Sequence, residues 1–248
     1  MVIYYLYNSG FTIELGRDAL IIDYYKGNLG KPWRMPLEKH PSDYRDIYVS
    51  ASHVHGDHYN RAIFGWLSER EDIRYILSDD IKPSVPSGAL NKNGKHSIDF
   101  ICDGESRRIG NLDVSAYGST DEGISFHIVA ENGTSIFHAG DLNYWHWKDE
   151  STDNEVAEAY ASFARELEKI KKSVQKIDVA FFPVDPRMGS DYYRGAVLFC
   201  EAMKPAYLIP MHFSAVFSPP KEFYTAVTAY TKVVHVGPGS GKLSDLIL

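Results

Sequence analysis

Several features are scarce or missing in this chain of 248 residues, and each absence narrows what the protein can be. The two cysteines, Cys102 and Cys200, are too few for a disulfide-stapled scaffold, so we expect a reducing compartment. There is no run of 18 apolar residues and no signal-peptide pattern, so we expect a soluble, cytoplasmic protein without a membrane partner. The net charge of −7 gives no reason to attract a phosphate backbone, which argues against a nucleic-acid partner.

The chain also lacks an internal repeat, a low-complexity segment and an obvious linker. With 44% hydrophobic residues, a chain of this length can bury a large core. We therefore expect a single domain that spans residues 1–248, with a small molecule as its partner. A homo-oligomer is compatible with the sequence but is not specified by it.

Short predicted strands dominate the chain up to residue 138. Apolar, β-branched and aromatic runs are separated there by turn signals such as Asn8-Ser9-Gly10 and Glu131-Asn132-Gly133. The predicted strands of this part cover residues 2–7, 11–15, 19–23, 46–50, 74–77, 98–102, 107–109, 112–117, 124–130 and 135–138. Between two of them, the apolar spacing of residues 60–70 predicts a helix.

Helices alternate with strands after residue 150. Thr152 and Glu155 form a capping-box signature, and an apolar stripe at steps of three and four runs from Val156 to Val174. The stripe fits the seam of a coiled-coil dimer or, as we favour, a helix packed on its own sheet. Further predicted helices cover residues 194–203 and 221–230, and predicted strands cover residues 178–183, 206–210 and 232–236. This alternation predicts an α/β fold in which helices are layered on sheets.

The most informative segment is His53-Val54-His55-Gly56-Asp57-His58, directly after the predicted strand 46–50. Three imidazoles and a carboxylate within six residues are side chains that bind divalent metal ions. In an extended segment successive side chains alternate, so His53, His55 and Asp57 would point one way and His58 the other. One segment would then serve two neighbouring ions. A histidine-rich surface loop is the alternative interpretation, which the spacing disfavours.

Two further ligand candidates stand at the ends of predicted strands. Asp141 follows the strand 135–138 through the small-residue turn Ala139-Gly140, and His212 follows the strand 206–210. Because one short segment cannot satisfy two divalent ions, we expect these two side chains to complete the site.

The order of these motifs resembles that of the metallo-β-lactamase-fold hydrolases: a strand, His-x-His-x-Asp-His, a distal histidine, a Gly-Asp turn and a final histidine. Residues 137–141 and 210–212 are similar to segments of the ascorbate-6-phosphate lactonase-like branch. The resemblance implies a four-layer αββα sandwich with metal ions at one edge of the paired sheets. The ligands that it implies are His53 and His55 for the first ion, Asp57, His58 and His212 for the second, and Asp141 between both.

The chain departs from the family pattern at the distal histidine. Residues 114–123 contain none, and Asp121 falls about where it would stand. A carboxylate oxygen ligates zinc at a distance similar to that of an imidazole nitrogen, so we predict Asp121 as the substitute ligand. The alternative is a first site that is completed by water or left empty. His138 precedes the Gly-Asp turn, and we interpret it as a supporting or core residue rather than a ligand.

The resemblance implies one or two Zn²⁺ ions as the cofactor, with Mn²⁺ or Fe²⁺ as alternatives. Such ions acidify a shared water and polarise a carbonyl or phosphoryl oxygen. We therefore expect a hydrolase that uses a metal-bound hydroxide, with Asp57 and Asp141 as catalytic carboxylates. Its substrate would be a small metabolite, anionic or neutral, of the lactone, ester or phosphodiester type. The competing class is a non-catalytic metal or ligand sensor on the same fold, with an incomplete first metal site.

Several subclasses of the family fit this sequence poorly. Redox di-iron members carry Glu where this chain has His55. The two-zinc β-lactamases supply a cysteine ligand, but Cys200 lies within the predicted helix 194–203, where we expect a core residue. RNA-processing members need a basic binding arm that the sequence does not offer.

Substrate-binding candidates lie in two loops that follow predicted strands. Trp145, His146 and Trp147 come soon after Asp141 and can form a pocket wall or a core aromatic cluster; in an extended run the tryptophans would share one side and His146 the other. Arg187 follows the strand 178–183 and can clamp an anion or form a salt bridge with Asp185 or Asp191.

Overall fold

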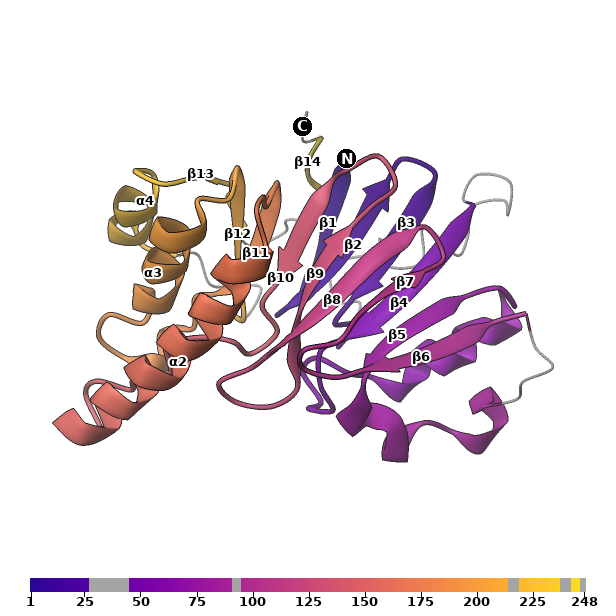
Figure 1. Ribbon diagram of the computed structural model, residues 1–248, viewed down its shortest axis with the longest axis horizontal. Helices are drawn as coiled ribbons and strands as arrows, with labels where there is room; N and C mark the ends of the chain where they lie inside the picture. Colours follow the sequence, from indigo (N-terminus) through magenta and orange to yellow (C-terminus); the bar gives the residue numbers. More distant parts are fainter. Residues whose placement is uncertain (27–44, 91–94, 214–218, 237–241, 246–248) are drawn as a thin grey trace.

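The computed structural model describes residues 1–26, 45–90, 95–213, 219–236 and 242–245. Within these ranges the chain forms two mixed β-sheets that pack face to face, with helices on both outer faces (Figure 1). This is the four-layer αββα sandwich that the motifs led us to expect. None of the helices in these ranges is long and apolar enough to cross a membrane.

The first sheet has the spatial order β14-β1-β2-β3-β4-β5-β6. Its strands are β1 (Val2–Tyr7), β2 (Gly10–Leu15), β3 (Asp18–Ile22), β4 (Asp46–Ala51), β5 (Arg74–Ser78), β6 (Ser97–Ile101) and β14 (Lys242–Asp245). The strands from β14 to β3 pair antiparallel, whereas those from β3 to β6 pair parallel.

The second sheet has the order β13-β12-β11-β10-β9-β8-β7 and repeats this design. Its strands are β7 (Ser106–Ile109), β8 (Leu112–Gly118), β9 (Ile124–Val129), β10 (Ser135–His138), β11 (Val179–Pro183), β12 (Tyr207–Met211) and β13 (Lys232–Val233). The strands from β7 to β10 pair antiparallel and those from β10 to β13 pair parallel. The two sheets are therefore similar halves of the fold.

Helices cover the outer face of each sheet (Figure 1). The second sheet carries α2 (Asp153–Ser173), α3 (Arg194–Met203) and α4 (Lys221–Val227), and η4 (Pro186–Met188) follows β11. The first sheet is covered by the 3₁₀ helices η1 (Arg61–Ser68), η2 (Asp79–Ser84) and η3 (Ser87–Leu90). The helix predicted over 60–70 is thus a 3₁₀ helix, in which Ile63 and Trp66, three residues apart, are buried together.

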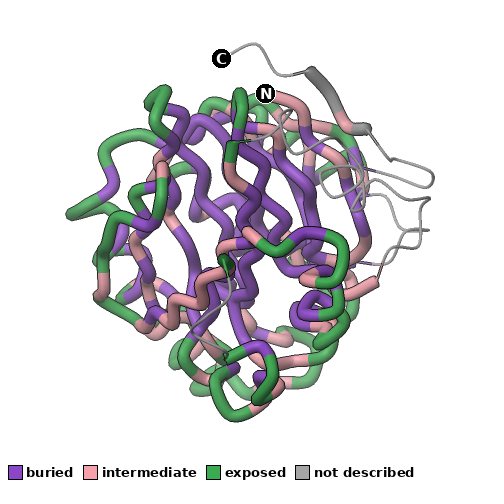
Figure 2. The backbone as a smooth tube through the Cα atoms, turned by 90° about the vertical axis from the view of Figure 1, so that its right-hand side faces the viewer, coloured by how far each residue is buried: buried purple, intermediate pink, exposed green. Residues whose placement is uncertain are grey.

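Strand alternation divides the core into two regions. In β4, Tyr48 packs between the sheets, whereas Ile47 and Val49 face the opposite way, toward Ile63 and Trp66 of η1. Figure 2 shows the result, because buried segments run through the centre and exposed ones lie at the rim. This packing holds both sheets in a fixed relation, so residues at the strand ends keep defined positions.

Helix α2 settles the choice between a coiled-coil seam and packing on its own sheet. It begins at Thr152 with the predicted capping box. Its residues Phe163, Leu167 and Ile170 are buried in the same core as the second sheet, which confirms the prediction of intramolecular packing. The strand β14 was not predicted, because a four-residue segment with one apolar side chain gives no strand signal.

Candidate metal centre

Strand ends from both sheets meet at one edge of the sandwich. In the first sheet, Asp23 follows β3 and His53 follows β4 closely; in the second, Asp141, Asp185 and His212 follow β10, β11 and β12. Because β3 and β4 are parallel and β10 to β12 are parallel, the carboxyl ends of these strands lie together. The prediction that Asp141 and His212 stand at strand ends beside the His53–His58 segment is confirmed, and their role as metal ligands stays a prediction.

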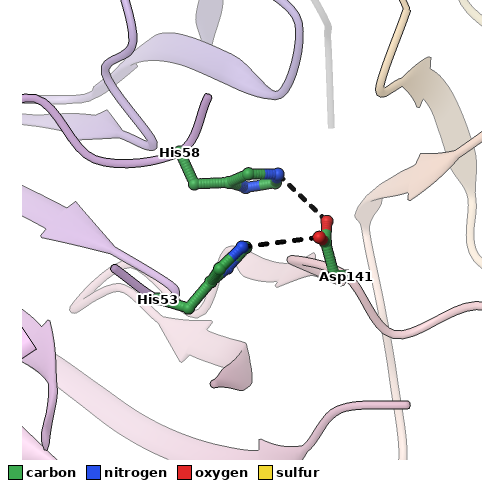
Figure 3. Close-up of side chains that lie close together, drawn as sticks. All are labelled: His53, His58 and Asp141. Carbon is green, nitrogen blue, oxygen red and sulfur yellow. Dashed lines mark ion pairs between the residues drawn. The ribbon is translucent and has the colours of Figure 1, made fainter. Parts of the chain in front are cut away.

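The His53–His58 segment does not continue as a strand, so the predicted alternation of its side chains is wrong. It turns instead, and the amides of His58 and Tyr59 donate to the carbonyl of His55 at 3.0 and 2.9 Å. The turn brings the rings of His53 and His58 to a centroid separation of 4.2 Å. Both rings therefore face the same carboxylate, that of Asp141 (Figure 3).

Asp141 reaches the site through a turn that only glycine accommodates. Gly140 has φ of +55°, and a Cβ atom there would lie 2.6 Å from the carbonyl of Ile124 and 2.9 Å from Cβ of Ser52. The Gly-Asp sequence therefore lets the end of β10 pass close to Ser52, which directly precedes the histidine segment. As a result Asp141 is almost completely buried between the two sheets.

Four buried ligand atoms converge without hydrogen-bond partners: Nε2 of His53, His58 and His212, and Oδ1 of Asp141. The nitrogens lie 3.4, 3.0 and 3.2 Å from carboxylate oxygens of Asp141. At these distances nitrogen lone pairs and carboxylate oxygens repel one another unless a cation lies between them, so the cluster calls for protons or a metal ion. Imidazole nitrogens with a carboxylate oxygen are the donor set that Zn²⁺ and similar ions prefer, so these residues fit a metal ion.

The other nitrogen of each ring is held by a hydrogen bond. Nδ1 of His58 lies 2.7 Å from Asp23 Oδ2, and Nδ1 of His212 lies 3.0 Å from Asp185 Oδ2. Nδ1 of His53 lies 3.0 Å from Ser52 Oγ, whose hydroxyl donates to Asp23. Since an ionised carboxylate only accepts, Nδ1 of His58 and His212 donates and Nε2 presents its lone pair to a metal.

The pKa shifts of the clustered histidines and of Asp141 show that the site favours positive charge. Burial lowers the pKa of His58, but Asp141 and Asp23 outweigh it and raise the pKa to about 10. Burial also lowers the pKa of His212, yet Asp141 and Asp185 raise it to about 9. Burial raises the pKa of Asp141, but His58, His212 and His53 hold it well below the usual range. Without a metal, protons therefore supply the cationic charge that an ion would supply.

The predicted ligands fall into groups in which the donor atoms lie within 4.8 Å of one another. One group contains Asp57, His58 and His212, which matches the second ion of the resemblance. Another contains His55, Asp121 and Asp141, and a third joins His53, His58 and Asp141. All seven predicted metal residues are thus brought together: His53, His55, Asp57, His58, Asp121, Asp141 and His212.

The loop that carries Asp121 is anchored beside Asp141. Thr120 Oγ1 donates to the carbonyl of Asn143 and accepts from its amide, at 2.5 and 2.9 Å. Sequence reasoning missed Glu122, whose Oε2 lies 3.2 Å from Nε2 of His55. This loop therefore offers two carboxylates, and it stays a prediction that Asp121 is the one that completes the first site.

A cavity of about 430 Å³ opens onto these ligands. Its lining residues are His55, Asp57, Thr120, Asp121, Asp141, Trp145, Trp147, Arg187 and His212. Trp145 donates from Nε1 to the carbonyl of Asp141 at 2.8 Å, and its ring meets that of His212 edge-on at 5.5 Å. The two indoles stack at a centroid distance of 6.5 Å. The pocket-wall interpretation of Trp145 and Trp147 thus agrees with their position.

His146 is a correction, because the structure places it away from this cavity. Its side chain is buried and stacks on Tyr144 at 4.4 Å, and its Nδ1 lies 2.9 Å from the Tyr144 carbonyl. His146 is not among the residues that line the cavity, which removes it from the substrate-binding candidates. His138 is buried and donates to the Ser9 carbonyl, as expected of a supporting residue, and Cys200 is a buried core residue of α3.

Arg187 forms the predicted salt bridge with Asp185 and also lines the cavity, and its role as an anion clamp stays a prediction. Its Nε and Nη2 bind the carboxylate of Asp185 at distances from 2.5 to 3.0 Å. Its side chain is nevertheless 67% exposed, and it lines the cavity. The supporting roles of Asp23 and Asp185 were not predicted. The signal in the sequence that could have identified them was their position just after buried parallel strands.

Comparisons with known proteins show the fold. No protein-family model and no curated protein sequence matches the chain. Among solved structures it is similar to the metallo-β-lactamase fold protein YhfI from Bacillus subtilis, with 12% identity, a TM-score of 0.59, and coverage of 93% of this chain and 89% of YhfI. It is also similar to Zn²⁺-bound PqqB from Methylobacterium extorquens, with 13% identity, a TM-score of 0.55, and coverage of 95% of this chain and 86% of PqqB.

A third similar structure is CmlA, a diiron β-hydroxylase from Streptomyces venezuelae, with 13% identity and a TM-score of 0.55. This match covers 95% of the chain but only 53% of CmlA. Two of these similar proteins are thus described as metal proteins, with different metals. The two sheets, their helices and the shared edge of strand ends give this chain the metallo-β-lactamase fold.

Proposed function

We propose that this protein is a metal-dependent hydrolase of a small metabolite. The observation that carries the proposal is that buried Nε2 atoms of His53, His58 and His212 lie 3.0 to 3.4 Å from carboxylate oxygens of Asp141, and that Asp141 and His212 line an open cavity. A divalent ion held by these residues would supply the chemistry to acidify a water and to polarise a carbonyl or phosphoryl oxygen. Lactones, esters and phosphodiesters are the substrates that such chemistry hydrolyses.

The side chains have separable roles in this proposal. Nε2 of His58 and His212 would bind one ion and Nε2 of His53 would bind the other, with Asp141 available to both. Asp57 is 39% exposed and faces the cavity, while its Oδ2 accepts a hydrogen bond from Asn8 at 3.1 Å. The amide of Asn8 fixes this carboxylate, so Asp57 can orient an attacking water and accept its proton.

The two metal positions have matching donors. His53, His55, Asp121 and Asp141 would form the first, and His58, His212, Asp57 and Asp141 the second. Each offers two imidazoles and two carboxylates, a set that suits Zn²⁺ and also the harder ions Mn²⁺ and Fe²⁺. Within the fold, the segments 137–141 and 210–212 favour a place near the ascorbate-6-phosphate lactonase-like branch.

A non-catalytic metal or ligand sensor is the second candidate, and the exposure of the first site favours it. Asp121 is exposed, whereas His58 and His212 of the second site are buried. One buried ion with an open cavity beside it would report ligand binding without turnover. The ion count and the turnover of one preparation separate the two functions.

The test uses the full chain purified without chelator. Elemental analysis should find at least one equivalent of Zn, Mn or Fe, and the protein should hydrolyse 4-nitrophenyl esters, bis(4-nitrophenyl) phosphate or a simple lactone. The double variant His58→Ala/His212→Ala, purified in parallel, controls for contaminating hydrolases. Bound metal without any turnover above that control would favour the sensor, and absence of metal would reject both functions.

A further inference from the structure

Charge is unevenly distributed around the cavity. Three carboxylates, those of Asp57, Asp121 and Asp141, line its metal-facing side. Among the lining residues that the structure describes, Arg187 is the one with a permanently charged cation. The metal positions would use the carboxylates, so Arg187 is the cation left to face a bound molecule.

Arg187 is held in place although most of its side chain is exposed. Asp185, which is only 1% exposed, accepts from the Arg187 amide at 2.9 Å and from Nε and Nη2 of the guanidinium. This fork fixes the guanidinium plane, so little conformational entropy is lost when a ligand binds. Nη1 is not used by Asp185. The hydrogen bonds to Asp185 raise the pKa of Arg187 most, and the negative charges of Asp57 and Asp141 raise it further. This is expected of a cation that lies beside the candidate metal ligands.

The indoles of Trp145 and Trp147 form a flat wall of the same cavity. Both side chains are only partly buried, and their planes are 21° apart. Trp147 has φ of +39°, a backbone conformation that bulky residues rarely adopt. Such strain persists where the surroundings enforce it, and it clusters at ligand sites. Here it turns an apolar ring toward the cavity.

From this arrangement we infer that Arg187 binds an anionic group of the substrate while Trp145 and Trp147 stack on a planar part of it. The substrate class is therefore an organic anion with an aromatic or unsaturated ring. This inference rests on the hydrolase function proposed above, because it names the substrate of the same cavity. A carboxylate or phosphate group would meet Arg187 in a charge-assisted hydrogen bond beside the metal ligands.

The experiment measures binding, so it does not depend on turnover. The probes are 4-nitrobenzoate and its neutral analogue 4-nitrobenzamide, titrated by calorimetry into zinc-loaded protein. Arg187→Gln should weaken 4-nitrobenzoate by about tenfold or more and 4-nitrobenzamide by less than about twofold. Arg187→Lys keeps the charge and should recover part of the affinity. If the carboxylate of the probe also binds zinc directly, it adds the same amount to the affinity in all variants. The difference in affinity between variants therefore reports the contribution of Arg187.

The matched control is Arg107→Gln, which removes an exposed arginine that pairs at 2.8 Å with a carboxylate two residues earlier, Glu105. It should bind both probes as the wild type does. The proposal is overturned if Arg187→Gln binds 4-nitrobenzoate as tightly as the wild type, if it loses both probes equally, or if the wild type binds neither. Metal content, measured in every variant, shows separately whether the proposed hydrolase site is intact.

Discussion

Asp185 and His212, which follow neighbouring parallel strands, are joined by a hydrogen bond of 3.0 Å from the ring Nδ1 to a buried carboxylate. The bond fixes the ring so that Nε2 faces Asp141. Burial raises the pKa of Asp185, but His212 and Arg187 lower it to about 2, so the carboxylate stays charged. Through it, His212 would be a stronger and better oriented ligand for a metal ion.

Asp185→Asn should therefore weaken metal binding by about 10- to 100-fold while the protein stays folded. Competition with a chromophoric chelator measures the affinity. Asp178→Asn is the matched control, because Asp178 is also buried and accepts from the backbone amide of Ser135, away from the site. Equal metal affinity in the wild type and Asp185→Asn would contradict this role.

Removal of direct ligands should have a stronger effect. His55→Ala, Asp57→Ala and His212→Ala should each lower the bound metal and abolish hydrolysis, because each deletes a donor of a metal group. Elemental analysis of the purified variants provides the measurement. His127→Ala, which removes a histidine bonded to Ser135 within the second sheet, should keep the wild-type metal content. Unchanged metal in all three ligand variants would refute the assignment.

The role of Asp121 can be separated from that of its neighbour. If Asp121 completes the first site, Asp121→Ala should lose one ion and keep the ion at Asp57, His58 and His212. Asp121→His should keep or tighten binding, since imidazole and carboxylate ligate zinc at similar distances. Glu122→Ala serves as the comparison. Selective metal loss in Glu122→Ala, with none in Asp121→Ala, would transfer the role to Glu122.

Metal binding should release protons. Asp141, Asp23 and Asp185 raise the pKa values of His58 and His212, so the metal-free site should hold protons at neutral pH. An ion must displace these protons, so affinity should rise as pH increases toward 9, by about tenfold per pH unit for each proton released. Zinc titrations at pH 6 to 8 in buffers of different ionisation enthalpy count the protons. An affinity independent of pH would show that the rings are already neutral.

The tryptophan wall should contribute to binding more than to stability. Trp145→Ala and Trp147→Ala should raise KM or lower turnover with metal content intact, because neither ring is a ligand. Trp66→Ala is the contrast, since Trp66 is buried under the first sheet and its truncation should cost about 3–5 kcal/mol. Thermal melts compare the three variants. Midpoint drops as large as that of Trp66→Ala, with full activity in the folded fraction, would mean that the wall is a core cluster.

Much of the fold and of the metal site could be predicted because the signals are local. The apolar runs that became β10 and α3 were assigned with their exact bounds, and the ligands at 53–58, 141 and 212 stood in a motif order that the fold uses. Strand ends of parallel sheets gather at one edge, so the sequence order already indicated where these ligands meet.

What the sequence did not show depends on contacts between distant segments. The turn at His55 overrides strand alternation, because the peptide groups of residues 55–59 bond to each other rather than to a neighbouring strand. Asp23 and Asp185 act through hydrogen bonds to His58 and His212, 35 and 27 residues away. The position of each aspartate after a buried strand was visible in the sequence, but its histidine partner was not. The burial of His146 likewise depends on its stacking with Tyr144.

The candidate ligands belong to both sheets: His58 follows β4 of the first, and Asp141 and His212 follow β10 and β12 of the second. An ion held between them would link the two sheets at this edge, where the described strands of one sheet do not pair with those of the other. At 100 times its dissociation constant it would add about 2.7 kcal/mol to the stability of the folded chain. The lifetime of the protein in a cell would then follow the supply of the metal, because the metal-free chain would open and be degraded first.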